Sequence, residues 1–372
     1  MPYYVGLDVS VKSVSICVVD GEGKVLARGE TSSDPDAIAS FISEHAAGPE
    51  RIVHESGILA IWLTRELEKR GLPVICIDAR LAPKALSGRI NKSGPGDAEG
   101  LAQLARTGWF SRVHIRSEAS ERVLVLIGAR ERLIRMRKDL EAHVRGVLKV
   151  FGICMGSVGR ASLRQGFRDQ FAEAGQTNPA PGVMAGMFIP VHRALCAAAE
   201  AVDGDLRLIA RQSGLARRLM TVPGVGPVVA LSFIAPLDNA NRFRRSRDVG
   251  AFLGLPPRRH QSGGMGWSGR ISKCGDRDLR KLLYSAATSL ITQVRKLSKL
   301  RVWAKKLQDR KGFKKAAVAA SRKLAVVMMC IWRDGQISNR KRSSSPDNQP
   351  TPRPPETGRV QRPSGRRRIK PV

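Results

Sequence analysis

The sequence predicts an α/β amino-terminal domain, a long helical segment, and a small, mostly α-helical carboxy-terminal domain. Three observations predict this order. Short β-branched strands alternate with helices over the first 115 residues, leucines then recur every seven residues, and a glycine turn between helices follows. A chain of 372 residues is long enough to bury a hydrophobic core in each of two or more domains.

The amino-terminal domain, residues 1–115, begins with three strands joined by short turns. The expected strands cover 2–9 (PYYVGLDV), 13–19, 24–29, 51–54 and 73–78, and the expected helices cover 34–46 and 58–70. Asp34-Pro35 is typical of a helix start and Gly71 of a helix end. Three meandering strands, followed by strands alternating with helices, are the order of a ribonuclease-H-like α/β domain.

Residues 116–214 have a different pattern. Apolar side chains recur every seven residues at Leu126, Leu133, Leu140 and Val147, with charged residues between them, which predicts one long helix over about 117–151. A coiled coil with a second copy and packing within the same chain are equally open readings. Residues 152–187 are glycine-rich and read as an excursion, after which a second helix over 188–213 returns antiparallel to the first.

A compact domain is expected over 215–333, followed by a basic tail over 334–372. The tail has few apolar residues and many prolines, so it is expected to be disordered and to act as a loose nucleic-acid tether. From Gly335 onward there are ten Lys and Arg against two Asp and Glu, so the tail holds +8 of the net charge of +32 and the rest holds +24. A solubilising tail therefore does not explain the charge, which indicates a polyanionic partner, by default nucleic acid.

The cysteines and the apolar segments indicate a cytoplasmic protein. The six cysteines are scattered without a CxxC pair, which is typical of buried thiols in a reducing compartment rather than of disulfides or a zinc site. The start, MPYYVGLDVS, lacks the basic flank and cleavage site of a secretory signal. No uninterrupted apolar run approaches the roughly 18–20 residues of a membrane span, so no membrane partner is expected.

Three acids follow the strands of the amino-terminal domain. Asp8 ends the first strand, Glu55 ends the fourth, and Asp97 opens a helix after the fifth. Carboxylates gathered at one sheet edge repel one another unless a divalent cation lies between them, and two Mg²⁺ ions held in this way promote phosphodiester cleavage. Taken singly, the three are also explained as a turn acid, a solvated strand-end acid and a helix N-cap. The cost of burying a lone charge in the strand YYVGLDVS favours the metal site.

The carboxy-terminal domain opens with LMTVPGVGPVVALSFIA, residues 219–235, which has the form of a helix-hairpin-helix element. Gly224 and Gly226 permit a tight turn whose backbone N–H groups, together with a helix N-terminus, bind phosphate. A simple turn between two helices is the alternative.

A serine lies further on, within a cluster of basic residues. Ser262 is expected in a flexible Gln-Ser-Gly-Gly loop, where a hydroxyl attacks a phosphodiester if cations neutralise the transition state and a base removes the proton. A phosphate-binding loop without covalent chemistry is the alternative, and Ser268 and Ser272 compete for the same role. Ser272, ahead of the segment LRKLLYSAA, has the sequence context of a helix start or a phosphate contact. The surrounding basic residues are Arg258, Arg259, His260, Arg270 and Lys273.

Taken together, these segments resemble the transposases of the insertion sequence 110 family, which are relatives of the Piv-type DNA invertases. The resemblance covers nearly all of the chain except the tail, and the ordered set of motifs is far more specific than any one of them. The motifs are GLDVSVKS near the start, HES at 54–56, NKSGPGDAEGLAQLARTGWF at 91–110, LMTVPGVGP at 219–227, and RFRRSRDVGAFLGLPPRRHQSG with GRISKCGD at 242–276.

The resemblance implies a RuvC-like nuclease domain joined through a coiled coil to a serine-bearing domain. It implies four acids, Asp-Glu-Asp-Asp, that bind Mg²⁺, of which Asp8, Glu55 and Asp97 match three, and Ser262 as the residue that joins covalently to DNA. It also implies donor and target DNA, a non-coding bridge RNA, and a homo-oligomer of at least two dimers in the bacterial cytoplasm, at the nucleoid. The residues expected to bind nucleic acid are Lys92, Gly224, Gly226, Arg258, Arg259, Arg270 and Lys273.

Gly94 departs from the family pattern, because the last two acids of the family are spaced Asp-x-x-Asp and Asp97 is the later one. A glycine supplies no metal ligand. Either the copy is crippled, or a water or another acid such as Asp78 substitutes, or the loop is shifted. Three functions follow: an RNA-guided DNA recombinase with reduced cleavage, a RuvC-like nuclease that hydrolyses junctions with water, and a non-catalytic nucleic-acid-binding protein.

Overall fold

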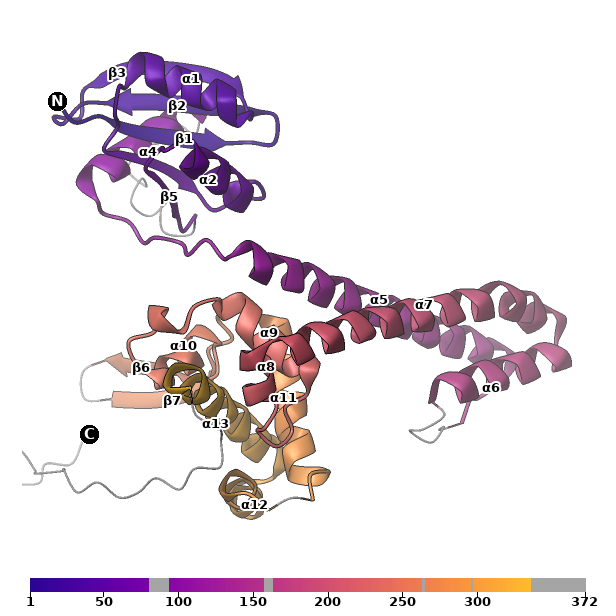
Figure 1. Ribbon diagram of the computed structural model, residues 1–372. Coiled ribbons are helices and arrows are strands. Elements are labelled where there is room, and N and C mark those ends of the chain that lie inside the picture. The colour runs from indigo at the N-terminus through magenta and orange to yellow at the C-terminus, as the bar shows by residue number, and fades with distance from the viewer. Residues whose placement is uncertain (80–93, 157–162, 263–264, 296, 336–372) are drawn as a thin grey trace, which may run out of the picture. The chain divides into compact units, whose positions relative to one another are not determined.

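The computed structural model of the protein describes residues 1–79, 94–156, 163–262, 265–295 and 297–335 (Figure 1). The expected disordered tail over 334–372 lies outside the described residues except for its first two. Lys92 also lies outside them.

The amino-terminal domain is built on a five-stranded mixed sheet in the order β3-β2-β1-β4-β5. The first three strands are antiparallel neighbours, whereas β4 runs parallel to β1 and β5 parallel to β4. This confirms the α/β class and the ribonuclease-H-like order predicted from the sequence. The strands are β1 (Tyr4–Val9), β2 (Ser13–Val19), β3 (Val25–Ser32), β4 (Arg51–Glu55) and β5 (Val74–Ile77).

Helices cover both faces of this sheet (Figure 1). On one face, α1 (Pro35–His45) and α2 (Ala60–Lys69) bury Ile38, Leu63 and their neighbours against alternate side chains of the strands. On the other face, α4 (Gly94–Thr107) buries Ala98, Leu101 and Ala105 against the remaining alternate side chains. The two cores therefore follow from the period of two in the strands.

Two long helices follow, α5 (Glu118–Leu148) and α7 (Pro179–Gln212), and they pack side by side. Arg130 pairs with Asp203, and Glu141 accepts a hydrogen bond from His192 at 2.9 Å, so the helices run antiparallel as predicted. The expected excursion over 152–187 is wrong in part. It contains α6 (Leu163–Thr177), and α7 begins nine residues before the predicted start at 188.

Among the described residues, α7 is the one helix that is long and apolar enough to span a membrane, by length and mean hydropathy alone, and 22% of its most apolar window is buried. The same helix packs against α5, α6 and α9.

The carboxy-terminal part is mostly helical and buries one large core around Phe233, Leu283 and Leu324. It contains a two-stranded antiparallel hairpin that the sequence prediction missed. Its elements are α8 (Gly214–Leu219), α9 (Pro227–Leu237), the 3₁₀ turns Ala240–Arg242 and Ser246–Asp248, α10 (Val249–Phe252), β6 (Pro257–Ser262), β7 (Met265–Ile271), α11 (Arg277–Thr292), α12 (Lys299–Lys311) and α13 (Phe313–Asp334).

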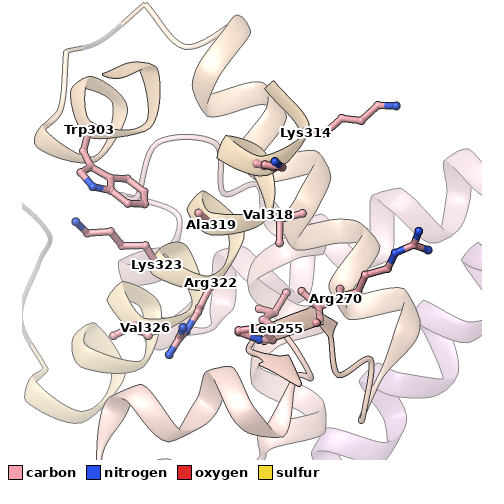
Figure 2. A pocket seen from close by; sticks show the side chains of 13 residues that line it. Leu255, Arg270, Trp303, Lys314, Val318, Ala319, Arg322, Lys323 and Val326 are labelled. Carbon is pink, nitrogen blue, oxygen red and sulfur yellow. The ribbon is translucent and has the colours of Figure 1, made fainter. Parts of the chain in front are cut away.

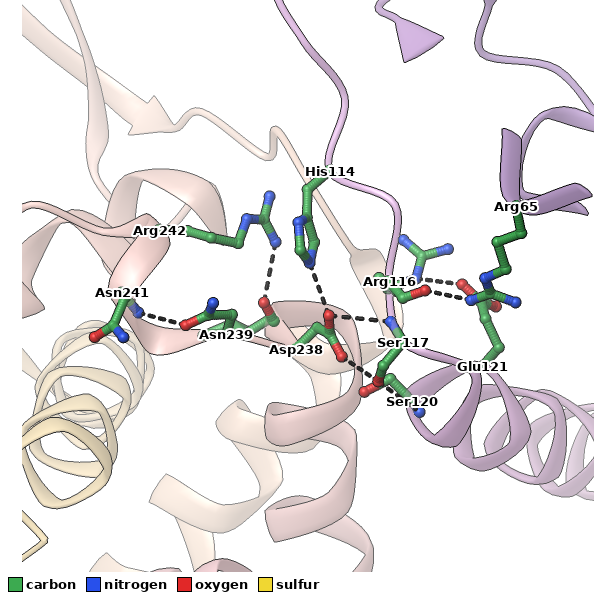
Figure 3. A network of polar contacts seen from close by, with 11 residues as sticks. Arg65, His114, Arg116, Ser117, Ser120, Glu121, Asp238, Asn239, Asn241 and Arg242 are labelled. Carbon is green, nitrogen blue, oxygen red and sulfur yellow. Dashed lines mark hydrogen bonds and ion pairs between the residues drawn. The ribbon is translucent and has the colours of Figure 1, made fainter. Parts of the chain in front are cut away.

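Asp238 joins the end of α9 to the start of α5 (Figure 3). Its carboxylate accepts hydrogen bonds from His114 Nε2 at 2.7 Å, from the backbone N–H of Ser117 at 3.1 Å and from the Ser117 hydroxyl at 2.5 Å. Burial opposes ionisation, but these bonds and one from Ser120 outweigh it and hold the pKa of Asp238 well below its usual range. The carboxylate therefore stabilises the fold only while it is ionised.

We expect Asp238→Ala to lower the free energy of unfolding by about 3 kcal/mol, since hydrogen bonds to a charged group contribute about 1.5–3 kcal/mol. Asp238→Asn keeps the size and one carbonyl acceptor, so its loss is expected to be smaller. Urea unfolding followed by circular dichroism measures both.

The contribution of Asp238 to stability also depends on pH. Because the pKa of Asp238 is depressed in the folded state, this contribution is present above the unfolded-state pKa of about 3.9 and is lost as the pH falls through the folded-state pKa. Equal unfolding midpoints for all three proteins at pH 7 would rule this out.

Candidate active site

Asp8 and Glu55 lie at the same end of two neighbouring parallel strands and on the same face of the sheet. The pairing of β1 with β4 places Gly6 beside Val53 and Leu7 beside His54, so the next position along brings Asp8 beside Glu55. Side chains alternate along a strand, so Asp8 shares the face of Gly6, and Glu55 shares the face of Val53. Val53 packs in the core beneath α4, which identifies this face as the one that α4 covers.

Gly6 brings α4 close to this face. A side-chain carbon at Gly6 would lie 2.1 Å from the backbone oxygen of Ala98 and 2.3 Å from the backbone nitrogen of Ala102, so only glycine permits this approach. Asp97 precedes Ala98 in the first turn of α4. The contact therefore places Asp97 near Asp8, two residues beyond Gly6 on the same strand face.

The electrostatics of Asp8 agree with this geometry. Burial, and secondly repulsion from the Asp97 carboxylate, raise the pKa of Asp8 above its ordinary value. A divalent cation between the two carboxylates would relieve that repulsion, and an all-oxygen donor set is the one that Mg²⁺ prefers. No group of three or more His, Cys, Asp or Glu side chains converges tightly enough to hold a metal ion among the residues that the structure describes. The neighbouring carboxylates of Asp8 and Asp97, with Glu55 on the same face of the sheet, therefore supply part of the ligand set that a divalent cation needs.

His54 fixes the backbone of Glu55. Its ring is fully buried, and burial lowers its pKa, which favours the neutral imidazole. Nδ1 is hydrogen-bonded to the Glu55 carbonyl at 3.0 Å, and Nε2 to the Thr64 hydroxyl at 2.8 Å, which itself bonds to the Ala60 carbonyl at 2.7 Å. Sequence reasoning included His54 in a motif without giving it a role. A histidine in a buried strand, directly before an acid, was the available signal.

Asp78 is placed differently from the other acids. Glu55 is paired with Ile77, whose side chain lies in the core beneath α4. Asp78 is the next residue, and its charge raises the pKa of Cys76, secondary to burial. Cys76 and Ile77 alternate along β5, so the charge of Asp78 acts on the Cys76 side. This placement argues against Asp78 as a substitute for the acid that is absent at Gly94, the first residue of α4.

The backbone at Ser262 differs from the expectation. Ser262 is the last residue of β6 and pairs with Met265 of β7, so it lies at the end of a strand and not in the predicted flexible loop. Gly263 and Gly264 lie outside the described residues. The side chains of Arg259, His260, Ser262 and Ser268 lie outside the described part. Alternation in the segments around Gly263-Gly264 was the signal for a hairpin.

Ser272 does not begin a helix, which corrects the first of the two roles expected for it; a phosphate contact stays a prediction. Asp276 caps α11 and accepts hydrogen bonds from the backbone N–H groups of Asp278 at 2.7 Å and Leu279 at 2.9 Å. Ser272 follows β7, and its carbonyl accepts from the Arg258 guanidinium at 3.3 Å.

The other predicted basic residues have mixed positions. Arg258 and Arg270 are exposed on the two strands of the hairpin. Lys273 has a φ of +59°, and its backbone N–H donates to the carbonyl of Gly254 at 3.0 Å, so it occupies a tight turn.

Gly224 and Gly226 lie in the turn between α8 and α9. Gly224 has a φ of +88°, and a side-chain carbon there would lie 2.6 Å from the backbone oxygen of Ala286 in α11. Packing therefore requires Gly224, whether or not the turn binds phosphate. Gly226 precedes α9 and has open space where a side-chain carbon would lie.

Comparison with known proteins matches two family models. Residues 5–153 match the DEDD-type IS110 transposase model, described as a transposase, and residues 216–302 match the transposase IS116/IS110/IS902 family. The transposase for insertion sequence element IS1111A of Coxiella burnetii is 28% identical over 88% of each chain. The probable family 20 transposase of Pseudomonas aeruginosa is 27% identical over 88% of this chain and 96% of its own. The RuvC structure from Thermus thermophilus aligns at 17% identity with a TM-score of 0.25, over 30% of this chain and 99% of that one.

Proposed function

Since the chain belongs to the IS116/IS110/IS902 family of transposases, we propose that it is a Mg²⁺-dependent, bridge-RNA-guided DNA recombinase of a mobile insertion sequence. The proposal is supported most directly by the juxtaposition of Asp8 and Asp97, two carboxylates from distant segments that approach each other at the start of α4. Burial first, and the Asp97 charge second, raise the pKa of Asp8.

In this proposal, Asp8, Glu55 and Asp97 hold the metal. The rigid sheet fixes Asp8 and Glu55, His54 holds the backbone of Glu55, and the approach of α4 at Gly6 fixes Asp97. When bound, Mg²⁺ supplies charge neutralisation at the scissile phosphate and its leaving oxygen. The carboxylates orient that charge.

Ser262 is the proposed nucleophile. Its hydroxyl oxygen forms a phosphoester bond to a DNA phosphorus, the bond from that phosphorus to the leaving sugar oxygen breaks, and the serine proton passes to a base while the leaving oxygen gains one. Basic residues on the same hairpin, Arg258 and Arg270, would neutralise the developing charge. The serine thus stores the phosphoester energy that strand exchange requires.

The nucleic-acid and oligomeric parts of the proposal rest on the resemblance and on charge. The +24 that lies outside the tail suits simultaneous contact with donor DNA, target DNA and a bridge RNA. We propose an oligomer of two dimers as the working unit, in the cytoplasm at the nucleoid. We also propose that Gly94 reduces strand cleavage while nucleic-acid binding is retained.

Trapping of a covalent protein–DNA adduct tests the serine assignment. Purified protein, Mg²⁺, the RNA transcribed from the flank of its own gene and labelled DNA are mixed, and adducts are resolved on denaturing gels. The adduct is expected with the parent and with Ser272→Ala, and is expected to be absent with Ser262→Ala. Cleavage that survives Ser262→Ala without any adduct would instead identify a nuclease that uses water.

A further inference from the structure

A large hollow lies on the carboxy-terminal part between the hairpin, α12 and α13 (Figure 2). Its volume is about 1010 Å³, at the upper end of the range for small-molecule sites. The half-buried side chains of Val318, Ala319 and Val326 present one face of α13 to it, while the opposite face of that helix is buried in the cores. An open, partly apolar helix face of this size indicates a binding surface.

The hollow is positively charged. Of its thirteen described lining residues none is acidic, and five carry a positive charge. These five surround the apolar floor, as Figure 2 shows for those it labels. The cations are Arg270, Lys314, Lys315, Arg322 and Lys323. An apolar floor beneath a ring of cations matches a ligand that is both flat and apolar in one part and anionic in another.

Trp303 of α12 forms one wall of the hollow. The ammonium of Lys323 lies 4.2 Å from the centre of its ring, a cation–π contact. Lysine has a flexible side chain, so this ammonium can swing from the ring to a phosphate and leave the ring face open to a base. The pair thus offers a stacking surface and a phosphate contact side by side.

A second hollow of about 510 Å³ adjoins Trp303. Leu297 and Val302 line it and are 77% and 41% exposed, and Lys299 and Lys306 supply two further cations, again with no acid among its described lining residues. Trp303 therefore lines two hollows of the same chemistry. Such a row of aromatic, apolar and basic groups is the pattern of single-strand binding, where bases stack on aromatic rings and cations follow the backbone.

We infer that this groove, made of the two hollows that Trp303 lines, binds an unpaired stretch of nucleic acid, with one base stacked on Trp303 and the phosphates on the surrounding cations. Duplex nucleic acid keeps its bases paired and stacked inside the helix, so its bases are not available to enter an apolar hollow or to stack on an indole ring. The inference extends the proposed function, because it assigns a binding site to single-stranded RNA or DNA. Strand cleavage alone does not require such a site. It concerns binding and so stands or falls independently of the acids and of Ser262.

Fluorescence anisotropy with the full-length protein tests this inference. The probes are a labelled single-stranded RNA, a labelled single-stranded DNA and a labelled duplex, each about 12 nucleotides long. This length lies within the range of known single-strand binding sites. Trp303→Ala is expected to weaken single-strand binding roughly 5- to 100-fold while duplex binding stays unchanged, and Trp303→Phe is expected to recover much of the loss. The RNA and DNA arms show which strand the groove prefers.

Two further variants separate binding from folding. Ala319→Phe fills the hollow from the open face of α13 without touching its buried face, and is expected to weaken single strands as Trp303→Ala does. Trp62→Ala removes another partly exposed indole, on α2, and is the matched control with no expected effect. Lys323→Gln is expected to lower the number of counterions released on single-strand binding by about one, measured from the slope of log affinity against log salt concentration.

Three outcomes would overturn the inference. In the first, Trp303→Ala and Ala319→Phe bind single strands as tightly as the parent. In the second, both variants lose single-strand and duplex affinity by the same factor, so that the groove contributes charge alone. In the third, an acidic peptide competes as well as the oligonucleotide, which would make the groove a peptide site.

Discussion

Gly94→Asp is expected to raise the rate of Mg²⁺-dependent strand cleavage by at least about 10- to 100-fold. Mutation of a residue that merely hydrogen-bonds to a metal ligand already lowers metal affinity or activity by that factor. Gly94 is the first residue of α4, and Asp97 lies three residues later, so the two positions are neighbours on one side of the first turn. A carboxylate there would join Asp97 on the side of the helix that approaches Asp8. Single-turnover cleavage of labelled DNA in the presence of the RNA measures the change.

Gly94→Asn is the matched control, because asparagine has the same size and also favours a helix start but carries no charge. Its cleavage rate is expected to stay near that of the parent. If Gly94→Asn cleaves as fast as Gly94→Asp, the gain comes from the helix start and not from a metal ligand. If neither variant cleaves faster than the parent, the glycine at position 94 does not limit cleavage by withholding a metal ligand.

Gly6→Ala is expected to lower the free energy of unfolding by about 3 kcal/mol, since the added carbon would lie within 2.3 Å of two backbone atoms of α4 that cannot move without shifting the helix. The same shift would displace Asp97 from Asp8, and a misplacement of about 1 Å costs roughly 100-fold in rate. Urea unfolding and cleavage, both measured in the Gly94→Asp background, give the two values.

Gly57→Ala is the control for this substitution, because a side-chain carbon at Gly57 has open space and the backbone there is not left-handed. It is expected to unfold at the parent's urea concentration. A Gly6→Ala protein as stable as Gly57→Ala would show that α4 does not lie against β1 as described.

Much of the amino-terminal domain was predictable from sequence, because its strands alternate and its helices carry start and end signals. Residues 152–187 were not, because their glycines hid α6, and helix propensity is a weak signal when packing decides. The hairpin was overlooked, although strand-like segments on either side of Gly263-Gly264 pointed to it.

The acidic residues of the site were predictable from the sequence, but the contacts that position them were not. An acid in the strand YYVGLDVS indicated a special role for Asp8. Gly6 in the same strand is a signal of a close approach that the sequence prediction did not include. Which helix approaches Gly6, and that Asp238 joins a serine 121 residues away, depend on packing between distant segments. The wall at Trp303 likewise exists only once α12, α13 and the hairpin come together.

Asp8 and Asp97 are proposed to hold a divalent ion, and a Mn²⁺ titration followed by electron paramagnetic resonance of the free ion tests this most directly. The parent is expected to bind Mn²⁺ weakly and Gly94→Asp more tightly, whereas Asp8→Asn and Asp97→Asn lose that binding. Asp139→Asn, at an exposed position on α5, is expected to bind like the parent. Equal Mn²⁺ binding by Asp8→Asn, Asp97→Asn and Asp139→Asn would contradict the claim.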